Sequence, residues 1–449
     1  MPRERIIAGL DIGSDKIVSI IAQYSEEEGL AVIGVSSVES RGIKKGVVVD
    51  IDKAVEAISE ALSASERMAG VTVAGVYVTV GGVQISSVNS PGVVAVSSPD
   101  TGINNGDVQR VIEAAQAISI PSSREIIHVI PRSYNVDSQE GVLDPVGMSG
   151  VRLQVETHIV SGATTALRNL AKCVQQVGLD VESLVFNGLA AADAVLTETE
   201  KELGVVLLDI GGGTTSLVVF EEGSPAYSAV LPLGGKNITN DIAIGLRISL
   251  EEAEKIKHFL SRQEDTAAPP TPPASERKTT DKEKEKKEKK KPADFSKNSK
   301  KKTAAADQLD LSTLNLQGIQ EIDRAEVFQR IIKPRLEEIF DLARQELKRG
   351  GYEKLPPSGL VICGGAAQTI GITKVAQKSL RVPVRIGYPQ GVSGLIEEIS
   401  TPAFAAAVGM LIFAAERLPT HTPLPFLNKL PRFQDYWQKA WQWARGFLP

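Results

Sequence analysis

Cysteine and long apolar runs are both scarce in this sequence of 449 residues. The two cysteines, Cys173 and Cys363, lie beside apolar patterns, so they form neither a disulfide framework nor a metal-ligand cluster and favour a reducing cytosol. The longest apolar run, 403–415, is too short to cross a bilayer. Thr401 and Pro402 before it predict the start of a core helix. No secretory leader is predicted, because charged residues lead directly into a strand pattern.

Charge is nearly balanced overall but unevenly distributed. The net charge of −5 combines a local +5 in residues 262–307, from 14 Lys/Arg against 9 Asp/Glu, with −10 in the remainder. The tract mixes Lys with Glu, contains a proline cluster and has almost no aromatic residues, which predicts a solvated, disordered linker. Binding of nucleic acid or anionic lipid by its basic residues is the alternative.

Two similar stretches stand far apart in the chain. Residues 207–220, LLDIGGGTTSLVVF, and residues 6–22, IIAGLDIGSDKIVSIIA, share one plan. In each, an apolar run reaches Asp-Ile-Gly, passes a small hydroxyl residue and leaves as a second apolar run. This pattern predicts two β-hairpins, with Asp11 corresponding to Asp209. A single repeat at long separation indicates two related halves rather than a solenoid.

The turns of these hairpins have residues suited to phosphate. Their glycines allow positive φ and close approach of a ligand, and exposed amides with hydroxyls form an anion-binding concavity. A glycine-rich hairpin without a ligand is the alternative for either copy alone. Two such hairpins facing each other across a cleft would hold a triphosphate. Asp11 and Asp209 would then hold a hydrated Mg²⁺, which needs few protein ligands.

The segments between the hairpins complete two α/β halves. Residues 30–38, 46–50 and 71–80 read as strands, and 51–69 reads as a helix. Many short strands around one helix, 105–117, are expected in 84–160, which we interpret as an inserted subdomain. Helices are expected at 164–177 and 187–197.

The second half contains further signals. Gly234 and Gly235 precede a helical pattern, whose N-terminus is a candidate anion site. Ser249 and Glu252 have capping-box spacing for a helix over 250–260. A long helical pattern, 324–348, is expected to break at Pro334. Residues 359–372 read as a buried strand ending in Gly364 and Gly365, which leave room for a flat ligand.

These motifs, in this order, resemble the actin/heat-shock-chaperone/sugar-kinase ATPase superfamily. Within it the chain resembles the FtsA family of bacterial division proteins over nearly its whole length. The residues that carry this resemblance are DPVGMSGVRL (144–153), GGKNITNDI (234–242) and EAEKIK (252–257). The resemblance implies a two-lobed α/β actin-like ATPase fold of duplicated ribonuclease H-like domains, with an FtsA-type inserted subdomain and a C-terminal amphipathic helix.

The resemblance also implies a division into subdomains. They are 1–83 with 161–203 (first lobe, 1A), 84–160 (1C), 204–243 with 349–416 (second lobe, 2A), 244–261 with 308–348 (2B), 262–307 (charged insertion), 417–431 (linker) and 432–449 (membrane-targeting helix).

An ATP site with Mg²⁺ follows from the same resemblance. Its first phosphate motif would comprise Asp11, Gly13, Ser14 and Lys16. The second would comprise Asp209, Gly211, Gly212, Gly213, Thr214 and Thr215, followed by Gly235 and Lys236. Glu254 and Lys257 would contact the ribose and base. Gly364, Gly365 and Ala366 would form the adenosine motif. The catalytic residues stay unknown.

Members of this family tether the tubulin-like protein FtsZ to the membrane and form filaments. The resemblance therefore implies the following partners: the FtsZ C-terminal peptide, further copies of the chain, anionic lipids and other division proteins, but no nucleic acid. It implies a peripheral location on the cytoplasmic face of the cell membrane at the division site. Arg335 and Glu338 are the candidate docking residues for the FtsZ peptide.

Two features depart from the family pattern. The helix between the halves begins Asn187-Gly188-Leu189, where the family more often has proline. The charged insertion interrupts the FtsZ-docking subdomain, and it either is inert or modifies that contact.

The C-terminal residues predict a membrane-binding helix from their own pattern. A proline-rich spacer at 420–425 precedes it. From 433 on, one helical stripe would collect Phe433, Tyr436, Trp437, Trp441 and Phe447, with Trp443 at its edge. All three tryptophans of the chain lie here, and tryptophan favours the bilayer interface. Docking of this helix on the protein itself or on a partner is the alternative to interfacial binding.

Three other functions are weaker. A sugar kinase needs a catalytic base beside a substrate pocket, and none is identifiable in the sequence. A chaperone needs a large substrate domain after the ATPase, whereas only a spacer and one helix follow Glu416. An actin-like ATPase of a pilus-assembly complex at the membrane is the closest alternative, and the 144–153 motif with the amphipathic tail argues against it.

Overall fold

The computed structural model describes residues 5–117, 120–265, 308–310 and 321–417. The chain forms two compact units. Unit 2 comprises Ile238–Leu336 with Thr369–Ile372, and unit 1 comprises the remainder. The predicted charged tract is largely outside the described residues, and the predicted tail helix is entirely outside them.

The first sheet of unit 1 begins with a meander of antiparallel strands, β1 (Arg5–Ile12), β2 (Lys16–Ser25) and β3 (Gly29–Glu39). Two parallel strands, β6 (Gly75–Val80) and β11 (Asp180–Phe186), extend it beyond β1. The short strand β19 (Ser393–Gly394) pairs with β3 at the opposite edge, so the order is β11-β6-β1-β2-β3-β19.

The second sheet repeats this plan. Three antiparallel strands, β12 (Val205–Ile210), β13 (Thr215–Glu221) and β14 (Ser224–Leu231), come first. Two parallel strands, β17 (Leu360–Cys363) and β18 (Val384–Ile386), then extend the sheet beyond β12. Because the order β14-β13-β12-β17-β18 matches β3-β2-β1-β6-β11, the expected duplication of an α/β half is confirmed.

Helices cover both faces of the first sheet. Helix α1 (Ile51–Ala69) has Asp50 as its N-cap, accepting from the Lys53 amide, and ends at Gly70 in the left-handed conformation. It packs on β2 and β3 beside α3 (Thr164–Gln176). On the opposite face, α4 (Asn187–Val195) packs against α12 (Ala405–Glu416) and reaches the strands of both sheets.

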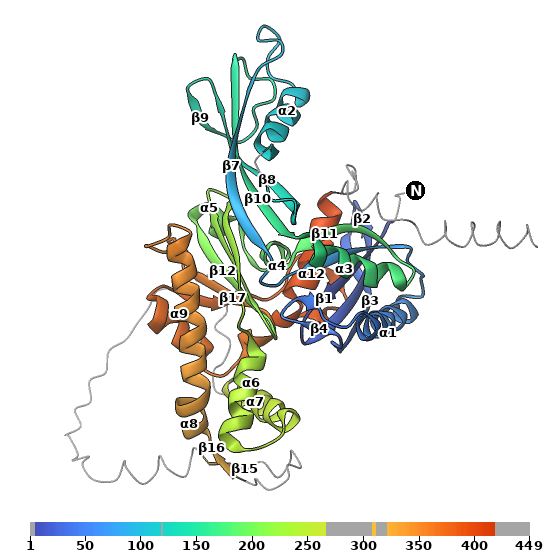
Figure 1. Cartoon of the computed structure of the whole chain (residues 1–449), viewed down its shortest axis with the longest axis vertical. Helices are drawn as coiled ribbons and strands as arrows, with labels where there is room; N and C mark the ends of the chain where they lie inside the picture. The colour runs from blue at the N-terminus through green and yellow to red at the C-terminus, as the bar shows by residue number, and fades with distance from the viewer. Residues whose placement is uncertain (1–4, 118–119, 266–307, 311–320, 418–449) are drawn as a thin grey trace, which may run out of the picture. The chain divides into compact units, whose positions relative to one another are not determined.

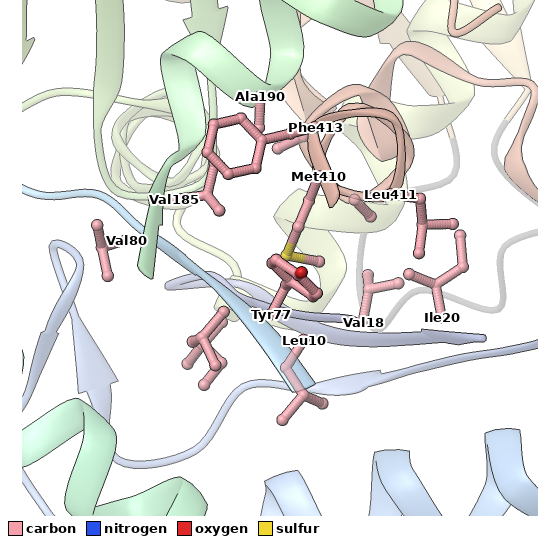
Figure 2. Packing of buried hydrophobic residues seen from close by; sticks show 14 of the residues in the cluster. Leu10, Val18, Ile20, Tyr77, Val80, Val185, Ala190, Met410, Leu411 and Phe413 are labelled. Carbon is pink, nitrogen blue, oxygen red and sulfur yellow. The ribbon is translucent and has the colours of Figure 1, made fainter. Parts of the chain in front are cut away.

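The contact between α4 and α12 is unusually close (Figure 2). A Cβ atom added at Gly409 of α12 would lie 1.6 Å from the carbonyl oxygen of Ala190 of α4. Likewise, a Cβ atom at Gly9 of β1 would meet the Met410 side chain at 2.2 Å. Helix α12 is apolar on all sides and buried, as expected for a core helix. It therefore packs at the centre of unit 1, between the two copies of the α/β half.

The inserted subdomain has its own sheet and core. Its strands β7 (Ser86–Ala95), β8 (Arg124–Val136), β9 (Gln139–Val142) and β10 (Arg152–Ala163) pair in the order β7-β10-β8-β9. They project with helix α2 (Asn105–Gln116) from the rest of unit 1 (Figure 1). The prediction of many short strands is wrong, since β7, β8 and β10 each have ten or more residues. Turn signals such as Asn89-Ser90-Pro91-Gly92 lie within β7, where pairing with β10 overrides them.

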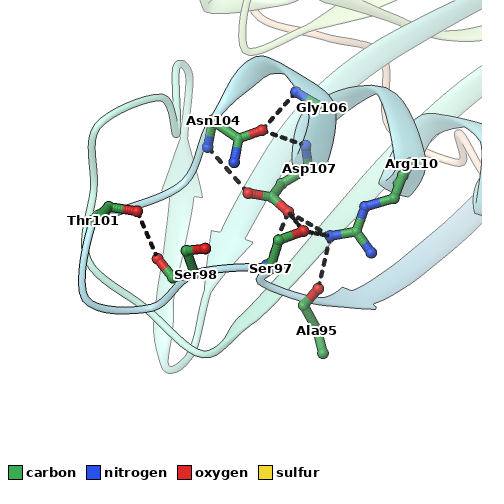
Figure 3. Close-up of polar contacts among 8 residues, drawn as sticks. All are labelled: Ala95, Ser97, Ser98, Thr101, Asn104, Gly106, Asp107 and Arg110. Atoms are coloured by element: carbon green, nitrogen blue, oxygen red, sulfur yellow. Dashed lines mark hydrogen bonds and ion pairs between the residues drawn. The ribbon is translucent and has the colours of Figure 1, made fainter.

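A polar cluster anchors α2 to this sheet (Figure 3). Asn104 and Asp107 form a reciprocal capping box at the start of the helix. The buried Asp107 carboxylate also accepts from the Ser97 hydroxyl at 2.7 Å and pairs with Arg110. The Ser97 hydroxyl bond, with the others, lowers the pKa of Asp107, so the carboxylate stays ionised.

Unit 2 is mainly helical. Helix α6 (Gly235–Leu246) enters it, and α7 (Leu250–Asp265) follows, with the predicted capping box between Ser249 and Glu252. Because α7 continues through Asp265, residues 262–265 are helical rather than part of a disordered tract. A short hairpin pairs β15 (Gln308–Asp310) with β16 (Glu321–Asp323).

The long helical pattern after this hairpin does not break at Pro334. Helix α8 (Arg324–Val327) passes through a π-helical segment, η2 (Phe328–Ile332), into α9 (Lys333–Arg349). Proline lacks the amide that would bond to the carbonyl four residues earlier. The widened turn just before it, in which the Lys333 amide bonds to the Phe328 carbonyl, lets the helix continue.

The remaining elements are short connections. They are β4 (Ile43–Lys44), β5 (Val47–Val48), α5 (Glu198–Leu203), the 3-10 turns η3 (Gly365–Gln368) and η4 (Pro402–Phe404), α10 (Ile372–Leu380) and α11 (Ile396–Ile399). In the described ranges, no helix has the length and apolarity needed to span a membrane.

Candidate functional site

The two predicted hairpins have matching turns. In the β1–β2 turn, the Gly13 amide bonds to the Lys16 carbonyl at 3.0 Å. In the β12–β13 turn, the Gly211 amide bonds to the Thr214 carbonyl at 2.9 Å. The internal repeat therefore extends to individual backbone hydrogen bonds.

The tips of the two hairpins lie against each other. A Cβ atom at Gly212 would lie 2.5 Å from Cβ of Asp15, and one at Gly213 would lie 3.0 Å from Cβ of Ser14. None of Gly13 and Gly211–Gly213 has positive φ, so our expectation of that backbone conformation is wrong. Glycine is required in the second turn because the first turn leaves no room for a side chain.

A carboxylate stands beside each turn, partly buried at Asp11 and buried at Asp209. Asp11 accepts from the Thr79 hydroxyl at 2.5 Å, and Asp209 accepts from the Asn187 side-chain amide at 3.0 Å. Burial and the nearby charge of Asp11 raise the pKa of Asp209 to about 7, although Asn187 and Lys16 oppose the shift. Burial also raises the pKa of Asp11. A further cation nearby would therefore stabilise the ionised form of both carboxylates.

Asn187 is a site residue that the sequence reasoning missed. Besides donating to Asp209, its side-chain oxygen accepts from the Ser216 hydroxyl at 2.9 Å. It begins α4, so this helix connects the acidic pair to the core. The departure of residues 187–189 from the family pattern was the available signal.

Two lysines approach the turns from different elements. Burial lowers the pKa of Lys16, against the charges of Asp11, Asp15 and Asp209, and its ammonium lies 3.5 Å from the centroid of the Phe404 ring. The Lys236 ammonium donates to the Ser14 carbonyl at 2.8 Å and pairs with Asp15 at 3.1 Å. Lys236 therefore connects the start of α6 to the first hairpin.

The expected anion site at the N-terminus of α6 is engaged within the protein. The amides of Gly235 and Lys236 donate to the carbonyls of Gly211 and Gly212, both at 2.8 Å. The Gly234 amide donates to the Asn237 side chain at 3.0 Å. These bonds fix α6 to the second hairpin and leave the Lys236 side chain as this segment's charged group.

Two of the predicted hydroxyl groups also have protein partners. The Ser14 hydroxyl accepts from the Gly46 amide, and the buried Thr215 hydroxyl donates to the Leu233 carbonyl, both at 2.8 Å. Thr214, at the turn, is partly exposed. The structure thus places all predicted phosphate-motif residues in or beside the two turns. Some of their polar groups, such as the Ser14 and Thr215 hydroxyls, form hydrogen bonds that stabilise the turns.

The glycine pair after β17 has two different surroundings. Gly364 has φ of 86°, and a Cβ atom there would lie 2.4 Å from Oδ1 of Asp209. Nothing lies within 4 Å of the corresponding position at Gly365. The space next to Gly365 is therefore open to a side chain, whereas that next to Gly364 is filled, and Ala366 beside them is buried.

The predicted ribose- and base-contacting pair belongs to unit 2. Lys257 pairs with Glu254 at 2.7 Å and donates to the Thr239 hydroxyl at 2.9 Å. Burial would raise the pKa of Glu254, but the His258 hydrogen bond and the Lys257 charge outweigh it and lower the pKa to about 2. This cluster forms the polar contact between α6 and α7.

The candidate partner-binding residues lie on α9. Arg335 forms a two-pronged ion pair with Asp241 of α6, at 2.6 and 2.9 Å, and Glu338 is exposed. Arg335 therefore holds α6 to α9 whatever else it contacts. The predicted membrane-binding residues are outside the described ranges.

No group of three or more His, Cys, Asp or Glu side chains in the described residues is arranged to hold a metal ion. The two carboxylates Asp11 and Asp209 are the metal donors expected from the sequence. Their charge, which Lys16 offsets only in part, fits a hydrated divalent cation that keeps most of its water ligands.

Family models and curated relatives agree on one family for this chain. The family model described as "Cell division protein FtsA" matches residues 206–409, and the model described as "SHS2 domain inserted in FTSA" matches residues 82–161. Cell division protein FtsA of Pseudomonas aeruginosa is 36% identical over 92% of this chain and 90% of its own length. The protein of that name from Bacillus subtilis is also 36% identical, over 92% of this chain and 84% of its own length.

Among solved structures, the PilM-PilN type IV pilus biogenesis complex has a chain with a TM-score of 0.58 at 17% identity. The match covers 91% of this chain and 98% of that chain. At this identity, the similarity concerns the fold alone.

Proposed function

The chain belongs to the FtsA family of cell division proteins, with the actin-like fold of that family, and from this premise we propose that it is an ATP-binding, polymerising membrane adaptor. In this role it tethers FtsZ filaments to the inner face of the cytoplasmic membrane and helps to assemble the division septum. Any ATP turnover is slow, because its purpose is to set the state of assembly.

The observation that carries the proposal is the contact between the two hairpin turns. Their tips meet at Asp15 and Gly212, while the partly buried Asp11 and the buried Asp209 stand on either side. Lys16 and Lys236 bring positive charge to the same turns. Backbone turns with lysines suit phosphate oxygens, and paired carboxylates suit the accompanying cation.

Mg²⁺ would supply positive charge beside the phosphates. Asp11 and Asp209 would hold it through water, in agreement with the raised pKa that burial gives each of them despite the charge of Lys16. The assignments of Glu254 and Lys257 to the ribose and base, and of Gly365 and Ala366 to the adenosine, stay predictions. So does the division of the chain into subdomains.

Membrane and FtsZ binding form the second part of the proposal. The stripe of aromatic residues in 433–448 supports interfacial binding, which would make the chain a peripheral protein at the division site. Arg335 and Glu338 are the proposed docking positions for the FtsZ C-terminal peptide. Because Arg335 also pairs with Asp241, a substitution there would change the contact between α6 and α9 as well as any docking.

A role in a pilus-assembly complex at the membrane is the weaker alternative. It is supported by the PilM-like fold at 17% identity. In contrast, curated relatives at 36% identity carry the name FtsA, and the inserted subdomain matches the model of the FtsA insertion.

Co-sedimentation of the full chain with anionic lipid vesicles and FtsZ tests the tether. We expect FtsZ to sediment only with the chain, with vesicles and with its own C-terminal peptide intact. Replacing Trp437 and Trp441 with Glu should abolish vesicle binding, because charge on the apolar stripe opposes insertion. Replacing Gln438 and Gln442 with Glu adds the same charge to the opposite face and should weaken binding far less. Equal effects of the two pairs would contradict the proposed helix.

A further inference from the structure

We propose that Phe404 is the positioning residue of Lys16: the face of its ring holds the lysine ammonium at the phosphate-binding turns through a cation–π contact. The inference rests on the proposed nucleotide site and adds to it a residue that is not among the predicted site residues.

The geometry of the contact is direct. The Lys16 nitrogen lies 3.5 Å from the centroid of the Phe404 ring, within the range of strong cation–π interactions. Lys16 is the first residue of β2, directly after the first turn. Phe404 ends the η4 turn, so the contact joins residues nearly 400 positions apart.

The η4 turn is itself anchored in the site. The Phe404 amide donates to the Thr401 carbonyl at 3.0 Å, which closes the turn. The Gly364 amide donates to the Pro402 carbonyl at 2.9 Å, which ties the turn to the glycine pair beside Asp209. The backbone that carries the Phe404 ring is therefore tied to the Gly364 turn and leads directly into helix α12.

An aromatic ring suits this position better than a carboxylate would. Three acids, Asp11, Asp15 and Asp209, already attract the Lys16 ammonium, and a full ion pair with any of them would neutralise it. A ring face attracts the cation through its quadrupole and has no net charge. Lys16 is thereby held in place with its charge still available to a phosphate group. Partial burial of Lys16 strengthens the contact, because the ammonium has less water to lose.

Graded fluorination of the Phe404 ring tests the contact in the full chain. Fluorine withdraws electron density from the ring face while nearly preserving its shape, so the cation–π attraction falls with each added fluorine. We expect ATP affinity, measured calorimetrically with Mg²⁺, to fall stepwise and reach about a three- to thirty-fold loss, the range of a cation–π contact. Phe404→Leu should give a similar loss of ATP affinity. Phe404→Trp, which keeps an aromatic ring face, should bind ATP about as well as the wild-type chain.

A second measurement needs no nucleotide. In protein labelled with ¹³C at the lysine ε-carbon, the Lys16 ε-protons should show an upfield ring-current shift, assigned by its absence in Lys16→Arg. This shift should disappear in Phe404→Leu and decrease along the fluorinated series as the ammonium leaves the ring.

Phe413 of helix α12 provides a matched control. Its ring lies 3.5 Å from the Arg417 guanidinium carbon, so it makes the same kind of contact with a cation other than Lys16. It is buried between α12 and the core (Figure 2). Fluorination of Phe413 should leave both ATP affinity and the Lys16 shift unchanged.

The outcomes separate the two ideas. An unchanged ATP affinity across the Phe404 series, or an equal loss in the Phe413 series, overturns the role of Phe404. An absent Lys16 ring-current shift in the wild-type chain overturns it as well. If the wild-type chain binds no ATP while the shift is present and follows the series, the contact stands and the proposed nucleotide function fails.

Discussion

At the scale of single residues, the central feature is a pair of carboxylates that folding brings together at an energetic cost. Asp209 is buried near Asp11, and Asn187 and Lys16 offset only part of the cost of its charge. Burying ionised groups in this way is typical of functional sites rather than of stable cores. Stability and ligand binding therefore compete at Asp209.

The pH dependence of stability should reveal this competition. The pKa of Asp209 is about 7 in the folded chain and 3.8 in a model peptide, so the folded state holds its proton more tightly. Stability from this group is complete below about pH 4 and is lost as pH rises through 7. Without Mg²⁺ and ATP, we expect the free energy of unfolding to fall by at least about 1 kcal/mol between pH 5 and 8. Chemical denaturation would measure the fall. A similar fall in Asp209→Asn would show that it does not come from the titration of Asp209.

The role of the hairpin turns in nucleotide binding is tested by combining Asp209→Ala with Gly212→Val. The first change removes a proposed cation ligand, and the second forces a side chain into the 2.5 Å space beside Asp15. We expect loss of measurable ATP binding in calorimetry while the circular dichroism spectrum stays native. Retained affinity would exclude these turns as the phosphate site.

At the scale of elements, α4 and α12 connect the site with the core. Helix α4 begins at Asn187, which holds Asp209, and α12 follows Phe404, which contacts Lys16. The two helices meet where Gly409 crosses the backbone of Ala190. Any separation of these helices should therefore displace Asp209 through Asn187 and Lys16 through Phe404.

Substitution of Gly409 tests this crossing. In Gly409→Ala, the new methyl group would overlap the Ala190 carbonyl, so the helices must separate. We expect a loss of about 1–3 kcal/mol or more in the free energy of unfolding. Gly365→Ala is the control, because its added methyl group meets nothing within 4 Å and should leave the unfolding midpoint in thermal denaturation nearly unchanged.

At the scale of the whole molecule, the inserted subdomain is joined to the rest of unit 1 by side-chain contacts in addition to its two chain connections. Ser87 of β7 donates its hydroxyl to the Ser228 carbonyl and accepts from the Ser228 amide of β14. Asn89 donates to the Ala226 carbonyl, and the buried His158 bridges Asn89 and Ser228. These side chains cover the outer edge of β14, an edge strand that would otherwise invite pairing with another chain.

The charged tract should be dispensable for ligand binding. Because α7 extends through Asp265, the deletion should begin at residue 266 and end at 307, with a flexible linker of about ten residues in its place. We expect ATP affinity and vesicle binding to match the full chain. Loss of either, in protein with an unchanged melting temperature, would show that the tract takes part in binding. A change in FtsZ binding alone would assign it to that contact.

Much of this organisation could be predicted from local sequence. The Asp-Ile-Gly repeats predicted both hairpins, and apolar periodicity predicted α1 to within the residue, because these signals act between neighbours along the chain. The same local rules failed where distant partners dominate. Pairing with β10 carried β7 through its turn signals, and the π-helical segment carried the long helix past Pro334.

The sequence by itself determined which residues are candidates for the site, since Asp11, Asp209 and the turn glycines are recognisable from type and spacing. Only the tertiary structure decided how they work together. It brought the two turns into contact, so that the glycines serve close approach rather than positive φ. It placed Asn187 on Asp209 and Phe404 on Lys16. The physical reason is that hydrogen bonds and cation–π contacts between residues far apart in the chain depend on packing, which no local pattern encodes.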